Sequence, residues 1–276
     1  MTQQDLAQTF RRLHVGRPLV LPNAWDAGSA RVVEDAGAAA VATTSAGVSW
    51  AHGRRDGQGL ALADMAAAVR AVVRVVRVPV TVDIESGYGA GTPADVAAAV
   101  DAVLAAGAVG VNLEDSPGRD GAPLLSVDDH VARIAAARAA ARDRGVDLFV
   151  NVRTDVYLAD VGDPAGRFDA VVRRAAAYVA AGADGVFVPA VRDADTIGRL
   201  AAAIDAPLNV MAGPGALSVD ALADLGVARV SLGPSLALAA LGLVRRAVRE
   251  VLAEGTYDAL DGALPFGDAN ELFAAT

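Results

Sequence analysis

The chain has 276 residues, and neither cysteine nor lysine occurs among them. The lack of cysteine excludes disulfides, thiolate metal sites and a cysteine that acts as nucleophile or acid. The lack of lysine excludes Schiff-base chemistry by a side chain. Acidic residues outnumber basic residues, so the chain has a net charge of -9 and an isoelectric point near 4.8. This balance argues against a nucleic-acid partner, which would need a basic face.

Long hydrophobic runs are also missing. No charge-free apolar run is long enough to cross a membrane, and the first residues, MTQQDLAQTFRRLH, lack the apolar core of a signal peptide. Hydrophobic residues still make up 54% of the chain, which is ample for a large core. We therefore expect a cytoplasmic protein with no membrane partner.

Strand-like and helix-like runs alternate along the chain. The expected strands are residues 18–23, 39–43, 80–85, 109–113, 148–153, 185–189, 208–211 and 229–232. The expected helices are residues 26–36, 62–77, 92–106, 126–144, 168–181, 193–204, 218–225 and 236–252, with a long loop at 44–60. Eight such units predict an α/β fold, a single (β/α)₈ TIM barrel over residues 1–276. An open doubly wound sheet is the alternative, but no GxGxxG motif follows the first strand.

The third expected strand ends in two carboxylates, Asp83 and Glu85. Side chains alternate along a strand, so both are predicted to share one face. Paired carboxylates repel each other unless a cation lies between them. We interpret the pair as a site for a hard cation, Mg²⁺, held largely through water. The alternative is a polar strand end that leads into a loop.

Other polar residues lie where a barrel places its active site, at the carboxyl ends of strands and in the following loops. Acidic groups follow the third and fourth strands, and one arginine follows the fifth. This arrangement suits an anionic substrate that chelates Mg²⁺. Structural roles are the alternatives: Arg153 could pair only with Asp155, and Asp56 could only form a turn. The candidates are Thr43, Thr44, Ser45, Gly47, Asp56, Asn112, Glu114, Asp115, Asn151, Arg153, Asp155 and Asn209.

Three motifs resemble those of the isocitrate lyase and phosphoenolpyruvate mutase superfamily. They are Asp83-x-Glu85-x-Gly87-Tyr88-Gly89, Gly110-Val-Asn-Leu-Glu114-Asp115 and Asn151-Val-Arg153-Thr-Asp155. A single motif would be weak, but three in the expected order within a βα repeat are specific. The resemblance implies a barrel whose eighth helix is exchanged between subunits, in a homodimer or homotetramer. Residues 253–276 would be a tail that packs on the barrel or on the neighbouring subunit.

The resemblance also implies Mg²⁺, with Mn²⁺ as an alternative, and a small carboxylate substrate that reacts through an enolate. It makes Asp83 the direct metal ligand, with Asp56, Glu85 and Glu114 holding the metal's waters. Ser45 and Gly47 would hold the substrate carboxylate. Arg153 would bind the oxo oxygen or the departing anionic group, and Asn209 would line the far wall. The residues with expected catalytic roles are Arg153, Glu114 and Arg119.

The loop at residues 116–123 departs from the family pattern. Lyases of the superfamily carry a cysteine there and phosphonate enzymes a lysine, whereas Arg119 is the basic residue of this loop. Arginine stays charged and is a poor proton donor. His52 is the next candidate acid. In a lid role, the loop would close over the pocket and bring Arg119 to the substrate.

Carbon dioxide leaves without protonation, so decarboxylation of an oxaloacetate-like acid demands least from the protein. We therefore favour a Mg²⁺-dependent carbon–carbon lyase of a 2-oxo or 2-hydroxy carboxylate. One alternative is P–C bond chemistry, as a phosphonomutase or phosphonopyruvate hydrolase. The other is a non-catalytic barrel that binds a small carboxylate.

Overall fold

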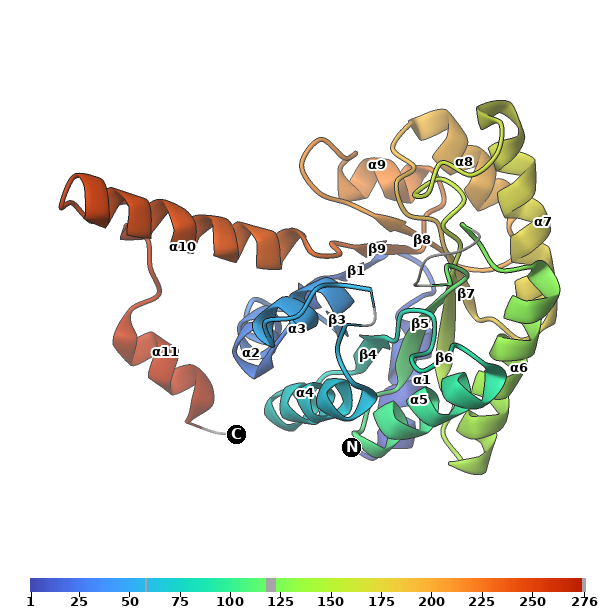
Figure 1. Cartoon of the computed structure of the whole chain (residues 1–276), viewed down its shortest axis with the longest axis horizontal. Helices are drawn as coiled ribbons and strands as arrows, with labels where there is room; N and C mark the ends of the chain where they lie inside the picture. Colours follow the sequence, from blue (N-terminus) through green and yellow to red (C-terminus); the bar gives the residue numbers. More distant parts are fainter. Residues whose placement is uncertain (58, 118–122, 275–276) are drawn as a thin grey trace.

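The computed structural model describes residues 1–57, 59–117 and 123–274. Within them, parallel strands form one sheet in the order β1-β9-β8-β7-β6-β5-β4-β3-β2. The sheet curls into a nearly closed barrel with helices around it (Figure 1), as the alternating sequence pattern predicts. The strands are β1 Leu19–Leu21, β2 Asn23–Ala24, β3 Val41–Thr43, β4 Val80–Asp83, β5 Gly110–Glu114, β6 Phe149–Arg153, β7 Gly185–Phe187, β8 Leu208–Met211 and β9 Arg229–Ser231.

The first predicted strand is split into β1 and β2 at Pro22, which lacks a backbone N–H. β1 pairs with β9, while β2 pairs with β3. The Asn23 side chain links β2 to the segment after β9, because its oxygen accepts the backbone N–H groups of Leu232 and Gly233, both at 2.9 Å. β1 and β2 together occupy one position in the barrel, so the nine described strands fill eight positions. The predicted (β/α)₈ barrel is confirmed.

Helices follow the barrel strands at the predicted places. Most begin at a polar cap; Thr92, for example, caps α5 through Asp95, with Pro93 in the first turn. No described helix is long and apolar enough to span a bilayer. The helices are α1 Gln3–Arg12, α2 Ala27–Asp35, α3 Ser45–Ala51, α4 Leu62–Val75, α5 Pro93–Ala105, α6 Val127–Asp143, η1 Pro164–Gly166, α7 Arg167–Ala180, α8 Ala194–Ala203, α9 Val219–Asp224, α10 Ser235–Ala253, η2 Asp258–Leu260 and α11 Phe266–Phe273.

The predicted loop at 44–60 is wrong in its first half, because residues 45–51 form helix α3. The glycine and serine content of this segment is typical of a loop. Its residues Ala46, Gly47, Val48 and Ser49 are nevertheless buried. Tertiary packing therefore outweighs local helix propensity here.

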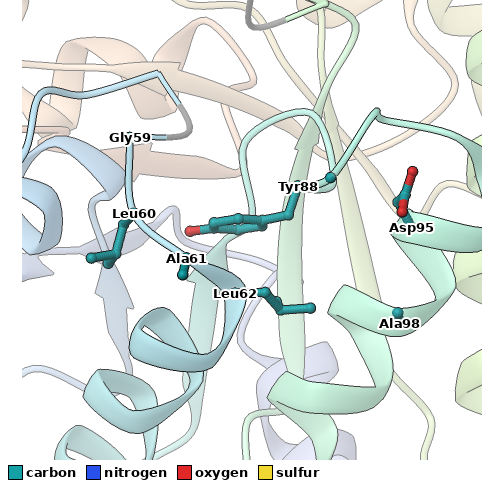
Figure 2. Close-up of a pocket in the computed structure, with 8 residues that line it drawn as sticks. Gly59, Leu60, Ala61, Leu62, Tyr88, Asp95 and Ala98 are labelled. Atoms are coloured by element: carbon teal, nitrogen blue, oxygen red, sulfur yellow. The ribbon is translucent and has the colours of Figure 1, made fainter.

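The predicted shared face of Asp83 and Glu85 is also wrong. Strand β4 ends at Asp83, and Glu85 has a φ of 52°, so strand alternation does not reach it. A tight turn follows, and within it the Tyr88 ring points toward the segment around Leu60 and Ala61 (Figure 2).

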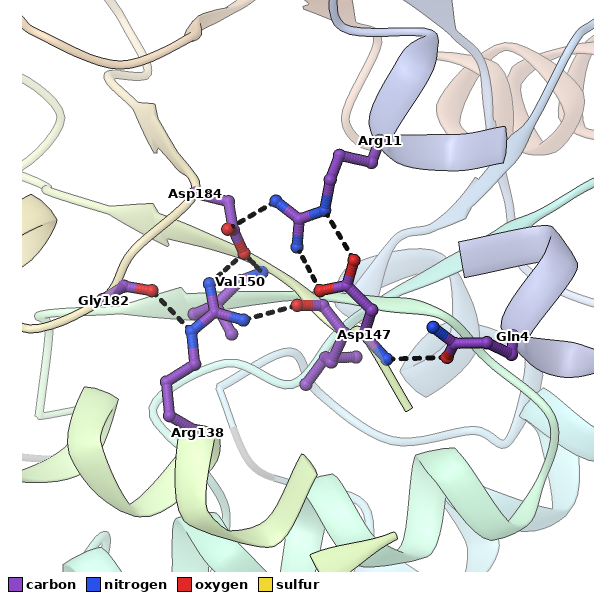
Figure 3. A network of polar contacts seen from close by, with 8 residues as sticks. Gln4, Arg11, Arg138, Asp147, Val150, Gly182 and Asp184 are labelled. Atoms are coloured by element: carbon purple, nitrogen blue, oxygen red, sulfur yellow. Dashed lines mark hydrogen bonds and ion pairs between the residues drawn. The ribbon is translucent and has the colours of Figure 1, made fainter. Parts of the chain in front are cut away.

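Helix α1 covers the amino end of the barrel, where Phe10 packs against Phe149. Charged side chains fix it there (Figure 3). Arg11 bonds both oxygens of Asp147, at 3.0 and 2.7 Å, and also reaches Asp184 at 2.7 Å. Asp184 is shared with Arg138 of α6. This network joins α1 to the loops that precede β6 and β7.

Helix α10 does not pack against the barrel along its length but projects away from it (Figure 1). The chain then turns back, and α11 contacts α2, where Arg31 donates to the carbonyl oxygen of Leu272 at 2.7 Å. The eighth helix therefore leaves its expected position beside its own strands.

Acid should destabilise the fold through His14, whose ring stacks on Phe149 with 4.0 Å between centroids. Burial, with help from the charge of Arg229, lowers the pKa of His14 to about 3. The unfolded chain binds a proton here below about pH 6.5, whereas the folded chain does not. This site should therefore remove roughly 1 kcal/mol of stability between pH 7 and pH 5.5.

We predict that His14→Phe flattens the dependence of unfolding free energy on pH over this range. Urea denaturation of both proteins at several pH values measures it. Parallel curves for the wild type and the variant would contradict the prediction.

Candidate active site

A cavity of about 210 Å³ lies at the carboxyl end of the barrel. Six residues predicted for the site line it: Thr44, Ser45, Asp56, Asp83, Asn112 and Arg153. They come from strands β4, β5 and β6, from the segment after β3 and from the loop after α3. The full lining is Asn23, Thr44, Ser45, Ala46, Asp56, Asp83, Asn112, Arg153, Leu158, Phe187, Pro189, Met211, Ser231, Gly233 and Pro234.

The other predicted residues lie around this cavity. Glu85 and Glu114 are buried beside Asp83, with 3% and 8% of their surfaces exposed. Gly47 lies within α3, where a Cβ would come within 2.7 Å of the Cβ of Trp25. The predicted role of Arg119 falls outside the described residues.

Asp83 is oriented by backbone groups. Its own N–H donates to the Thr43 hydroxyl at 3.1 Å, which fixes the end of β4 against β3. The N–H of Glu85 donates to Oδ1 of Asp83 at 3.1 Å. The N–H of Ser45 faces Oδ2 of Asp83 at 3.5 Å. The N–H groups of Glu85 and Ser45 thereby orient the carboxylate at the cavity.

Asp56 reaches the same place from the rim of the barrel. Partial burial raises the pKa of its carboxyl group, and the negative charge of Asp83 raises it further. The Ser45 hydroxyl hydrogen-bonds to Asp56 and opposes this effect. Asp56 and Asp83 both line the cavity.

Arg153 is shared by two carboxylates. It contacts Glu114 at 2.8 Å, and its guanidinium forms a bidentate pair with Asp155 at 2.6 and 2.8 Å. Burial raises the pKa of Glu114, and the charges of Asp155, Asp83 and Glu85 add to this, while Arg153 opposes it. The predicted structural pairing of Arg153 with Asp155 is therefore present, within a larger charged cluster.

Asp115 serves the scaffold. Its side chain accepts the backbone N–H of Asp155 and the hydroxyl of Tyr178, both at 2.9 Å, and pairs with Arg174 at 3.1 Å. It thereby fixes the loop that carries Asp155. His52, the alternative acid, directs a ring nitrogen to the Val48 carbonyl oxygen at 2.8 Å and is absent from the cavity lining.

A layer of amides lies beneath the cavity, inside the barrel. Asn151 donates to the side-chain oxygens of Asn112 and Asn209 at 2.9 and 3.1 Å. Arg229 donates to Asn112 at 3.1 Å and is 1% exposed. Asn209 belongs to this layer and has no exposed surface. The sequence analysis missed Arg229, although alternation along β9 with Ser231 would have placed it inside.

The opposite side of the cavity is apolar. Phe187 is the register partner of Arg153, so their side chains lie on the same face of the sheet. The apolar lining residues on this side are Leu158, Phe187, Pro189, Met211 and Pro234. The cavity therefore has a charged wall from β4 to β6 and a mostly apolar wall from β7 and β8 and the segments after β6, β7 and β9, with Ser231 of β9 as a polar exception. Sequence reasoning missed the apolar wall because these residues read as ordinary core.

The donor set fits a hard divalent cation. The cluster offers carboxylate oxygens from Asp56, Asp83, Glu85 and Glu114, which are the ligands that Mg²⁺ prefers. After burial, the charge of Asp83 raises the pKa of Asp56, and the charges of Asp83 and Glu85 help to raise the pKa of Glu114. In the described part of the chain, no three acidic or histidine side chains are close enough together to ligate one ion directly. The arrangement suits one direct ligand, with the remaining carboxylates acting through water.

Comparisons with known proteins find relatives over most of the chain. The phosphoenolpyruvate phosphomutase family matches residues 10–252. An uncharacterised protein of Mycobacterium tuberculosis is 38% identical over 239 residues, which are 86% of each chain. A probable 2-methylisocitrate lyase of Corynebacterium glutamicum is 30% identical, over 85% of this chain and 76% of its own. An oxaloacetate decarboxylase of Paraburkholderia xenovorans is 34% identical, over 70% and 64%.

Solved structures show the same architecture. A Burkholderia cenocepacia protein described as a lyase or mutase superposes with a TM-score of 0.91 at 40% identity, over 99% of this chain and 97% of its own. A phosphonopyruvate hydrolase in complex with oxalate and Mg²⁺ gives 0.84 at 28% identity, over 99% and 95%.

Removing Arg153 should leave Glu114 and Asp155 buried without a cation. We predict that Arg153→Met lowers the free energy of unfolding by about 3–5 kcal/mol at pH 8. The loss should shrink toward pH 6, because the folded variant then gains stability by binding protons at these carboxyl groups.

Urea denaturation at both pH values tests this, with Arg144→Met as the control. Arg144 pairs with Asp101 at the surface, with side chains 44% and 52% exposed, and its loss should change little. A loss for Arg153→Met that equals the control, or that is independent of pH, would refute the prediction.

Proposed function

Since the chain belongs to the phosphoenolpyruvate phosphomutase family, we propose that it is a Mg²⁺-dependent lyase that decarboxylates an oxaloacetate-like 2-oxo acid. Enzymes of the same superfamily include lyases, decarboxylases and phosphonate enzymes. The observation that carries the choice among them is the two-sided cavity, with carboxylates and Arg153 on one wall and apolar side chains on the other.

Asp83 would hold the metal directly, and Asp56, Glu85 and Glu114 would hold its waters. When bound, Mg²⁺ or Mn²⁺ would supply the positive charge that stabilises a developing enolate oxygen. Arg153, already fixed by Glu114 and Asp155, would direct its remaining N–H capacity toward the oxo oxygen. Because the Arg153 guanidinium would already be held in place before substrate binds, its side chain would need little reorganisation during the reaction.

Ser45 would bind the first carboxylate of the substrate, because it lines the cavity next to Asp56 and Asp83. Gly47 acts through shape: its missing side chain lets α3 lie against Trp25, which keeps Ser45 at the cavity. Asn209 acts from below, by holding Asn151 in the amide layer.

The second carboxylate of the substrate would face the apolar wall formed by Phe187 and Met211. In the reaction, the bond from C3 to this carboxylate breaks and its electron pair moves toward C2, giving the enolate and neutral carbon dioxide. C3 is protonated afterwards. A wall without charge disfavours the anion and favours carbon dioxide. A departing phosphoryl group would instead keep its negative charge and would be poorly matched to this wall.

Purified protein should release pyruvate from oxaloacetate in the presence of Mg²⁺ and should act far more slowly on phosphonopyruvate. EDTA should abolish turnover, and Mg²⁺ or Mn²⁺ should restore it. Asp83→Ala should lower kcat/KM by at least roughly 100-fold, since it removes the metal ligand. The surface variant Asp64→Ala is the matched control. Chelator-insensitive turnover, or full activity in Asp83→Ala, would refute the metal assignment.

We also propose that the chain is a homodimer or homotetramer that exchanges α10. An apolar stripe on α10 is exposed, at Leu241, Val244, Val248 and Val251. A groove of about 930 Å³ lies between α2 and α9, at the position that an eighth barrel helix would cover. Val20 and Val32 line this groove and are themselves 38% and 46% exposed. The exposed apolar stripe of α10 from a second copy would cover this largely apolar groove.

Light scattering at micromolar concentration should give a mass of about two or four times the 27.8 kDa of one chain. Val248→Glu on α10 and Val32→Glu in the groove should each shift the protein toward monomer. Arg246→Glu, on the other side of α10, should not. A wild-type monomer, or variants that assemble like the wild type, would exclude helix exchange.

A further inference from the structure

The hydrogen bonds of the amide layer beneath the cavity run in one fixed direction, which the two ends of the layer set. At one end, Nη2 of Arg229 donates to Oδ1 of Asn112 at 3.1 Å. A guanidinium has N–H donors and no acceptor, so only the oxygen of the Asn112 amide can face it. Asn151 donates to the same oxygen at 2.9 Å, which holds that oxygen inside the barrel a second time.

The other end of the layer is set by the backbone. Nδ2 of Asn209 donates to the carbonyl oxygen of Val210 at 2.8 Å, and a carbonyl oxygen can only accept. The oxygen of Asn209 therefore faces Asn151 and accepts from its Nδ2 at 3.1 Å. Turning over the Asn112 amide would bring donors against donors, and turning over the Asn209 amide would also bring two acceptors together.

This direction leaves the NH₂ group of Asn112 for the cavity. Asn112 lines the cavity, and its register partners are Asp83 on one side and Asn151 on the other. In the part of the chain that the structure describes, no group accepts a hydrogen bond from Nδ2 of Asn112. An amide whose oxygen is held twice from inside the barrel can only donate toward a ligand above it.

Packing alone does not explain an arginine at position 229. Its side chain is buried, and no carboxylate among the described residues forms an ion pair with it. Burying a charge without such a pair is unfavourable, so an apolar side chain would suit the barrel interior better. The polar contact that the guanidinium makes within the described residues is the one to Asn112, and it is therefore the contact that needs a functional reason.

We propose that Asn112 binds a carboxylate oxygen of the substrate through its NH₂ group, and that Arg229 is a positioning residue that keeps this donor directed at the cavity. An ionised carboxylate accepts hydrogen bonds and donates none, so a donor held in this direction suits it. This inference rests on the proposed function for the class of ligand, a small carboxylate. It concerns binding, however, so it can be measured without turnover.

Calorimetric titration of the purified protein with oxalate, in the presence of Mg²⁺, is the test. Asn112→Ala should raise the oxalate dissociation constant by at least roughly tenfold, the size expected for losing a hydrogen bond to a charged group. Arg229→Met should raise it by roughly fivefold, because affinity falls with the fraction of molecules whose amide still donates to the cavity. Arg229→Lys keeps a charged donor for the Asn112 oxygen and should restore most of the affinity.

The double variant tests whether Arg229 acts through Asn112. In the Asn112→Ala background there is no amide to direct, so adding Arg229→Met should cause no further loss of affinity. If Arg229→Met does not fold, Arg229→Gln takes its place, since a neutral amide can donate or accept and does not fix its neighbour. Arg138→Met is the control, because it removes a largely buried arginine near the amino end of the barrel; it should lower thermal stability and leave oxalate affinity unchanged.

Unchanged oxalate affinity in Asn112→Ala, or an equal loss in the Arg138→Met control, would overturn the proposal. A loss from Arg229→Met that persists in the Asn112→Ala background would show that the buried charge acts on the anion directly, and would overturn the positioning role. A wild-type protein that binds no oxalate would overturn this inference and the proposed function together. Oxalate binding that depends on Asn112, without decarboxylation of oxaloacetate, would refute only the proposed reaction.

Discussion

The excess of negative charge at the carboxyl end of the barrel is the constraint on which the rest of the site depends. Two of its acids, Glu114 and Asp155, share Arg153, while Asp83 is held by backbone N–H groups. Two like charges about 4 Å apart repel by roughly 4 kcal/mol near a protein surface. We propose that a divalent cation relieves this repulsion and leaves a site that is prepared for substrate.

The barrel supplies the rigidity that this concentration of charge requires. Parallel strands bring residues distant in sequence to one end, as in the register of Glu114 with Arg153 across β5 and β6. At the other end, the network around Arg11 and Asp184 fixes α1 over the amino end. Between the two ends, the barrel interior contains a layer of buried asparagine side chains in place of the usual aliphatic ones. Each of these amides hydrogen-bonds to a neighbouring amide. A polar site is thereby supported by a polar interior.

The order of strands and helices could be predicted from the sequence, because apolar runs and caps repeat with each βα unit. The charged half of the cavity could also be predicted, since its residues follow strand ends. Helix α3 could not, because its burial arises from tertiary packing. The direction of Glu85 could not either, because it depends on a left-handed turn pressed against α5. Phe187 and Met211 gave no signal, since apolar residues at strand ends look like core.

The central claim is that a divalent cation at Asp83 organises the chemistry of this cavity. Anomalous diffraction from crystals grown with Mn²⁺ and oxalate tests it most directly. The account predicts one manganese peak per chain, within bonding distance of Asp83 and facing Glu85 and Glu114, with oxalate completing its coordination beside Arg153. Oxalate bound at Ser45 and Arg153 with no manganese at Asp83, or manganese bound elsewhere on the chain, would contradict it.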